Sequence, residues 1–106
     1  MADEVTIEQL TQARAAGALV IDVREPDEYA GGHVPGAQSL PLGDLPARLQ
    51  ELPRDQTLYL VCQSGGRSMK AADQLAAAGY DVRSVAGGTT AWTGAGGQVS
   101  SGPDRG

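Results

Sequence analysis

Short apolar segments alternate with segments of helical pattern along most of this 106-residue chain. Runs of four to six apolar or β-branched residues that are bounded by Gly or Pro predict buried strands. Four such runs stand out: ALVID at 18–22, AQSLPL at 37–42, TLYLV at 57–61 and DVRSV at 81–85. Because a helical segment separates each run from the next, we expect an α/β fold whose sheet is mostly parallel and covered by helices on both faces.

Capping and stop signals mark the helices between these runs. Thr6 and Gln9 form a capping box at the start of a helix that is expected to end near Ala16. Further helices are expected at 24–32, 44–52 and 68–79, where Pro, Asp or Gly marks at least one end. A chain of this length forms a single domain. We expect the domain to span residues 1–93, followed by a Gly/Ser-rich flexible tail at 94–106.

Charge and cysteine content narrow the classes of function. The net charge of −5 argues against nucleic acids and anionic membranes as partners, because both require a basic face. The apolar runs are too short to span a membrane, and the acidic start, MADEV, lacks the apolar core of a signal peptide. A single Cys permits no intrachain disulfide and no Cys-rich metal site. We therefore expect no metal, no cofactor and a reducing, cytoplasmic setting.

The stretch YLVCQSGGRS, at residues 59–68, holds that single cysteine, Cys62, at the end of a predicted strand and just before a predicted helix. A strand-to-helix turn can direct successive amide groups and the positive end of the helix dipole at one anion. Such a site lowers the pKa of a thiol below its usual value of about 8.5. Gly65 and Gly66 permit close approach of the backbone, and Arg67 can offer paired donors to an oxyanion.

A second interpretation of Cys62 stays open on the loop alone. Cysteine is among the most buried residue types, and one at a strand end often serves as small apolar filling. The loop by itself thus predicts either an inert core sulfur or a reactive sulfur in an anion-binding cradle.

Three stretches together resemble rhodanese-like domains. LVIDVREPDEYAGGHVPGAQSLPL resembles the amino-terminal signature, VCQSGGRS the catalytic loop and VAGGTTAW the carboxy-terminal signature of that family, over roughly residues 3–93. The resemblance implies a sheet of about five mostly parallel strands and a single-domain sulfurtransferase of the thiosulfate sulfurtransferase type. It also implies that Cys62 is the catalytic nucleophile. The remaining residues of the implied active-site loop are Gln63, Ser64, Gly65, Gly66, Arg67 and Ser68.

The reaction implied by the resemblance uses no metal and no organic cofactor. Cys62 would take a sulfane sulfur from a small donor such as thiosulfate, or from a persulfide, and carry it as its own persulfide. It would then pass the sulfur to cyanide, to an external thiol or to a protein partner of the thioredoxin-like or sulfur-carrier kind. Because the chain has no second Cys, a thiol acceptor must come from outside.

Two alternatives from other functional classes accompany this interpretation. Phosphatases and arsenate reductases of the same fold carry one more residue between Cys and Arg, and their wider loop encircles a tetrahedral oxyanion. Only four residues separate Cys62 from Arg67, which favours a cradle for a single sulfur atom. The other alternative is a non-catalytic or sulfur-carrier module, since rhodanese-like domains also occur as binding and regulatory parts.

Several residues outside the loop also receive predicted roles. Asp22 and Arg24 end a strand near the expected site, where they would support the loop or, for Arg24, form an ion pair with Glu28. His33 is assigned to the structure of its turn, and Trp92 to the core. The side chains of Gln63 and Ser64 are expected to face solvent at the mouth of the site.

Overall fold

Five parallel strands form the central sheet of the computed structural model, which describes residues 2–105. Their order across the sheet is β1-β5-β4-β2-β3. Their bounds are β1 Asp3–Val5, β2 Leu19–Asp22, β3 Gln38–Ser39, β4 Leu58–Val61 and β5 Val82–Val85. The predicted parallel α/β fold is therefore confirmed, and β4, which carries the loop at its carboxyl end, lies in the centre of the sheet.

The short edge strand β1 was not predicted from the sequence. It pairs with β5 from Asp3 to Val5, but its residues DEV are exposed or half-buried and include two acids. A three-residue edge strand of this kind carries no apolar run, so periodicity does not reveal it. At the other edge, β3 is only two residues long, although a six-residue strand was expected there.

Four of the five helical segments within residues 2–105 fall where the sequence predicts them, with one difference in type, and the fifth, which carries Trp92, was not predicted. Their bounds are α1 Ile7–Ala15, α2 Pro26–Ala30, η1 Leu42–Glu51, α3 Gly66–Ala77 and α4 Gly88–Gly94. The capping box between Thr6 and Gln9 is present at α1. The segment η1 is a kinked 3-10 helix rather than the expected α-helix, because Pro46 lies inside it and Arg48 leaves helical geometry.

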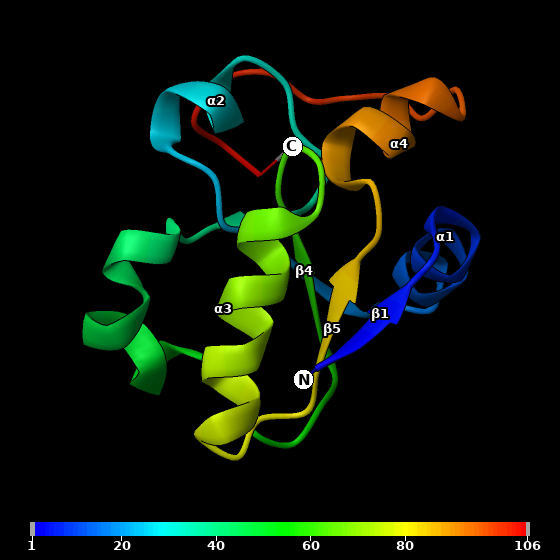
Figure 1. Ribbon diagram of the computed structural model, residues 1–106. Helices are drawn as coiled ribbons and strands as arrows, with labels where there is room; N and C mark the ends of the chain where they lie inside the picture. Colours follow the sequence, from blue (N-terminus) through cyan, green and yellow to red (C-terminus); the bar gives the residue numbers. More distant parts are fainter. Residues whose placement is uncertain (1, 106) are drawn as a thin grey trace.

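Alternation along the strands divides the core between the two faces of the sheet. On one face, Ile21 of β2 and Leu60 of β4 pack with α3 and η1. On the other face, Val20 and Val61 pack with α1, α2 and α4, whose contribution includes the buried Trp92. Figure 1 shows α3 in front of the sheet and α1 and α4 on its other side. The predicted coverage of both faces, and the packing role of Trp92, are thus confirmed.

Residues beyond α4 run back along the turn that joins α2 to β3. Ser100 exchanges backbone hydrogen bonds of 2.8 and 2.9 Å with His33, and the amide of Gly102 donates to the carbonyl of Ala30 at 2.7 Å. Figure 1 shows this red segment passing beside α2. The flexibility expected for this tail stays a prediction; its backbone contacts with the domain are a feature that its composition does not indicate.

Two kinds of feature are absent from the described part of the chain. No helix within residues 2–105 combines the length and the apolar character that a bilayer crossing requires. The same residues contain no group of three or more His, Cys, Asp or Glu side chains that could hold a metal ion.

Replacing a buried leucine of α3 tests the core described above. Leu75 is fully buried against the sheet, so Leu75→Ala is expected to lower the free energy of unfolding by about 2–5 kcal/mol. Lys70→Ala, in the same helix but on its exposed side, is the matched control and should change it by less than about 0.5 kcal/mol. Urea unfolding followed by circular dichroism measures both, and equal losses would contradict the assigned core.

Candidate active site

The thiol of Cys62 lies at the carboxyl end of β4, inside the turn that leads into α3. The amide of Gly65 points at its sulfur, with 3.1 Å between the amide nitrogen and Sγ. Gly65 has a φ of +114°, which residues with a Cβ rarely adopt, and this conformation turns its amide inward. Cys62 itself is buried, with 1 % of its surface exposed. The sulfur is therefore buried, as expected for a core residue, and it also accepts a hydrogen bond from the loop, as expected for an anion-binding site.

A chain of two hydroxyls leads from the sulfur into the core. Ser68 Oγ, in the first turn of α3, lies 3.5 Å from Cys62 Sγ and 2.8 Å from Ser84 Oγ of β5. In the thiol form the S–H donates to Ser68, whose own hydrogen points to the carbonyl of Gly65 at 3.1 Å. When Cys62 is ionised, Ser68 can turn its hydrogen to the sulfur while Ser84 donates to Ser68. Both serines are fully buried, so water does not compete for the hydrogen bonds of their hydroxyl groups.

These contacts act on the acidity of Cys62 against the effect of burial. Burial is the largest influence and raises the pKa of the thiol, because it disfavours the thiolate. Hydrogen bonds from the Ser68 hydroxyl and from the amides of Ser68, Gly65 and Ser64 lower it. Together they outweigh burial, and the pKa of Cys62 falls below its ordinary value. The loop is thus built to hold a negative sulfur at its centre.

The amino-terminal end of α4 fixes the backbone of the loop from the opposite side. The carbonyl of Cys62 accepts from the amide of Thr89 at 2.8 Å and from its hydroxyl at 3.0 Å, and the carbonyl of Gln63 accepts from the amide of Thr90 at 3.1 Å. Gly88 makes this approach possible, because a Cβ there would lie 2.3 Å from the carbonyl oxygen of Cys62. The VAGGTTAW signature therefore serves as a clamp on the cysteine loop.

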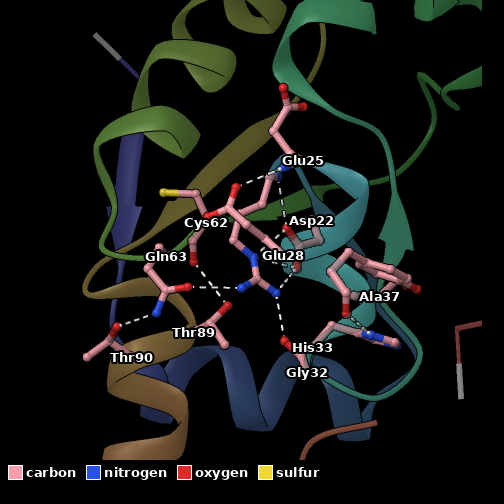
Figure 2. A network of polar contacts seen from close by, with 12 residues as sticks. Asp22, Glu25, Glu28, Gly32, His33, Ala37, Cys62, Gln63, Thr89 and Thr90 are labelled. Atoms are coloured by element: carbon pink, nitrogen blue, oxygen red, sulfur yellow. Dashed lines mark hydrogen bonds and ion pairs between the residues drawn. The ribbon is translucent and has the colours of Figure 1, made fainter. Parts of the chain in front are cut away.

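A buried ion pair supports the loop on the same side. Arg24 and Asp22 are 3 % and 0 % exposed, and their closest atoms are 2.8 Å apart. Arg24 also donates to the carbonyl of Gly32 at 2.8 Å and to Oε1 of Gln63 at 2.9 Å. Gln63 in turn donates to the hydroxyl of Thr90 at 2.8 Å. Figure 2 shows these contacts converging, while the sulfur of Cys62 points away from them.

Arg67 is bound by a carboxylate of α2, although part of its side chain stays exposed. Its two terminal nitrogens lie 2.7 and 2.9 Å from the two carboxylate oxygens of Glu28. The predicted ion pair between Arg24 and Glu28 is therefore wrong. Arg24 takes the fully buried Asp22 instead, because a charge at that depth requires a buried partner, whereas Arg67 and Glu28 are each about one-third exposed.

Two cavities flank the loop. The first, of about 260 Å³, is lined by Val23, Glu25, Leu42, Gly43 and Arg67, and we call it the thiol-side cavity. Val23 and Cys62 belong to the same buried cluster, and Leu42 packs against it, which places this cavity on the face of the sheet that carries the thiol. The second, of about 350 Å³, lies on the other side, over Arg24, Gln63 and Thr89.

Comparison with known proteins identifies the family of this fold and loop. The family model described as "Rhodanese-like domain" matches residues 6–95. The chain belongs to the rhodanese-like domain family. The family model covers all the elements that build the site, from α1 through α4.

Individual relatives of this rhodanese-like domain agree with that assignment. A sulfurtransferase of Allochromatium vinosum is 38 % identical over 95 residues, which cover 87 % of this chain and 89 % of that protein. The thiosulfate sulfurtransferase GlpE of Pseudoalteromonas translucida is 37 % identical over 70 % of this chain and 71 % of its own length. A rhodanese-related protein of Thermoplasma volcanium superposes with a TM-score of 0.87, at 28 % identity, over 92 % of this chain and 97 % of that one.

The structure brings together most of the predicted site residues of this rhodanese-like domain and adds others. The loop from Cys62 to Ser68 surrounds the sulfur, and Gln63 and Ser64 are exposed as expected, although both ends of the Gln63 side chain are bound. Their roles in catalysis stay predictions. Sequence reasoning missed Ser84 and gave Glu28 the wrong partner. Ser84 comes two residues after the apolar Val82 and so shares its buried face of the strand, which is the signal that could have revealed it.

His33 lies outside this constellation. Its ring is fully buried and stacks on Tyr29, with 3.7 Å between the ring centres. Its two nitrogens face the backbone carbonyls of Tyr29 and Arg105 at 2.8 and 3.1 Å. These contacts agree with the structural role that the sequence predicts for His33.

A Gly→Ala pair in α4 tests the clamp on the loop. Gly88→Ala is expected to lower the free energy of unfolding by roughly 2 kcal/mol or more and to slow alkylation of Cys62, because its Cβ would displace the Cys62 carbonyl and because its φ of +55° strains any side chain. Gly94→Ala, in the same helix, meets no atom within 4 Å and is the matched control. Denaturant unfolding and iodoacetamide kinetics measure the two effects. Identical behaviour of the two variants would contradict the assigned role of the α4 amino terminus in holding the loop.

The pH dependence of alkylation tests the hydroxyl chain. Since the pKa of Cys62 is lowered, iodoacetamide should reach half of its limiting rate at a lower pH than it does with an unstructured cysteine peptide. Ser68→Ala removes a group that lowers this pKa, so its midpoint should move upward. Ser64→Ala, which removes an exposed hydroxyl of the same loop, should keep the midpoint of the wild type. An unmoved midpoint in Ser68→Ala would show that the hydroxyl does not stabilise the thiolate.

Proposed function

We propose that this protein is a sulfurtransferase that moves a sulfane sulfur through a persulfide on Cys62. The observation that carries the proposal is the cradle around the sulfur, in which an amide and a hydroxyl chain favour a negative charge at Sγ. A cradle of this size suits a thiolate or the terminal sulfur of a persulfide. Family membership and relatives named as sulfurtransferases support the same chemistry.

In the first half-reaction the Cys62 thiolate attacks the outer sulfur of the donor. With thiosulfate, the sulfur–sulfur bond breaks, sulfite leaves with the electron pair, and Cys62 becomes a persulfide. With an organic persulfide, the outer sulfur is transferred in the same way and a thiolate leaves. The charges balance in both cases, and the amide of Gly65 is placed to stabilise the anionic sulfur before and after transfer.

In the second half-reaction an external nucleophile attacks the outer sulfur of the Cys62 persulfide. Cyanide leaves as thiocyanate, and a thiolate acceptor becomes a persulfide, while Cys62 returns as a thiolate. The chain holds one Cys, so a thiol acceptor is a separate molecule, such as a small thiol, a thioredoxin-like protein or a sulfur-carrier protein. Because Cys62 must be a reduced thiolate at the start of each cycle, we place the reaction in a reducing compartment such as the cytoplasm.

Intact-mass spectrometry tests the first half-reaction. Incubation with thiosulfate or with an organic persulfide should add the mass of one sulfur atom to the protein, and cyanide should remove it. Cys62→Ser should gain no sulfur and show no turnover, with its fold retained, because Ser offers no thiolate. A wild-type protein that gains no sulfur from either donor would refute the proposal.

The same samples separate the alternatives. A protein that takes up sulfur but passes it to no acceptor is a sulfur-carrier module, and one whose Cys62 resists alkylation at neutral pH is a binding module. Turnover of an aryl phosphate that disappears in Cys62→Ser would indicate phosphatase chemistry instead, although the four-residue spacing to Arg67 speaks for the smaller sulfur.

A further inference from the structure

The guanidinium of Arg67 stands at the thiol-side cavity, but both of its terminal nitrogens are already occupied. They contact the two oxygens of Glu28 at 2.7 and 2.9 Å, the paired geometry in which a guanidinium binds a carboxylate most strongly. Glu28 is held in place from a second direction, because its Oε1 also accepts from the amide of Glu25 at 3.1 Å. The carboxylate of the pair is therefore fixed by the start of α2.

The ion pair persists over the pH range in which a thiolate reacts. The hydrogen bonds that Arg67 donates lower the pKa of Glu28 from 4.5 to about 2, and the same bonds to the carboxylate raise the pKa of Arg67 above its ordinary value. Glu28 remains a carboxylate at any pH at which Cys62 is ionised. The charge of Arg67 is thus compensated throughout the working range of the site.

The carboxylate of Glu25 adds a further negative charge at the thiol-side cavity. Glu25 lines the thiol-side cavity and is exposed, and it takes part in none of the ion pairs found within residues 2–105. Two charged residues line this cavity, Glu25 and Arg67, whereas Glu28 reaches Arg67 from the side of the other cavity. Because Glu28 compensates the charge of Arg67, the carboxylate of Glu25 leaves the lining with a net negative charge toward an approaching anion.

Sulfur donors differ in how they respond to such a field. Thiosulfate carries two negative charges, and its sulfonate oxygens require a cation or several free donors. An organic persulfide with an uncharged organic part carries at most one negative charge, on the sulfur that enters the cradle. The apolar walls contributed by Val23 and Leu42 also favour an organic group over a sulfonate.

We propose that Glu28 is a specificity-determining residue of the donor site: by occupying Arg67 it withholds the loop's cation from thiosulfate and directs the site toward organic persulfides. The inference rests on the sulfurtransferase function proposed above. Glu28 touches neither the thiol nor, in this arrangement, the donor; it acts through the availability of Arg67.

The test compares two donors on the same variants. For wild type and Glu28→Gln, kcat/KM of Cys62 persulfidation is measured with thiosulfate and with 2-hydroxyethyl persulfide. Glu28→Gln keeps the shape of the side chain and frees the charge of Arg67, so the ratio of thiosulfate to persulfide kcat/KM should rise about tenfold. In Glu28→Gln/Arg67→Gln that rise should disappear, because the cation it depends on is gone.

Glu51→Gln is the matched control. Glu51 also forms a two-point ion pair with an arginine, Arg48, at 2.8 and 2.9 Å, at the end of η1 that leads back to the amino end of β4. Its removal changes the net charge equally, and the donor ratio should keep its wild-type value. A tenfold rise in Glu51→Gln as well would reduce the effect to net charge and overturn the proposal.

The remaining outcomes separate this proposal from the proposed function. If Glu28→Gln loads sulfur with an unchanged donor ratio, the specificity role is refuted while sulfur transfer stands. If neither donor loads the wild type, sulfur transfer itself fails. Should Glu28→Gln not fold, the ionic-strength dependence of the wild type decides: screening should raise kcat/KM for thiosulfate relative to the persulfide, and a fall would refute the proposal.

Discussion

The buried ion pair between Asp22 and Arg24 ties together three segments that meet at the carboxyl edge of the sheet. An isolated charge at this depth would be strongly unfavourable, so each side chain requires the other. The donors that Arg24 has left reach the carbonyl of Gly32 and the side chain of Gln63. Within residues 2–105 no buried side-chain nitrogen or oxygen lacks a partner. The position of the cysteine loop therefore follows from a satisfied polar centre that has little freedom to rearrange.

The alternation of side chains along the strands places the supporting ion pair and the reactive thiol on different faces of the sheet. Asp22 follows Ile21, and Cys62 follows Val61, so the ion pair and the thiol project to opposite faces of the sheet. The α4 clamp and Gln63 hold the loop from one face, and the sulfur meets the start of α3 on the other. This division keeps the buried ion pair away from the nucleophile, whose pKa is raised by burial and lowered by the hydrogen bonds of amides and a hydroxyl.

Local sequence patterns predicted the parts of this molecule that depend on local physics. The buried strand of TLYLV and the helix after the loop follow from hydrophobic periodicity, and the cradle follows from a strand-to-helix turn with glycines. The pairing of Arg67 with Glu28 could not be read in this way, because the two residues are 39 positions apart and meet only when α2 packs beside the loop. The edge strand β1 escaped for the opposite reason: its pairing with β5, not its composition, makes it a strand.

The direction of the strands also decides how the cysteine loop is oriented when the protein is attached to a surface or a fusion partner. Asp3 begins β1, and all five strands run in parallel, so this end of the chain lies at the edge of the sheet opposite to the one that carries Cys62. Arg105, by contrast, is bound to the turn after α2, through the amide of Gly36. A linker that precedes Asp3 would present the cysteine loop outward from a surface or a fusion partner. A linker that follows Arg105 would leave from the α2 side of the molecule, the helix that supplies the partner of Arg67.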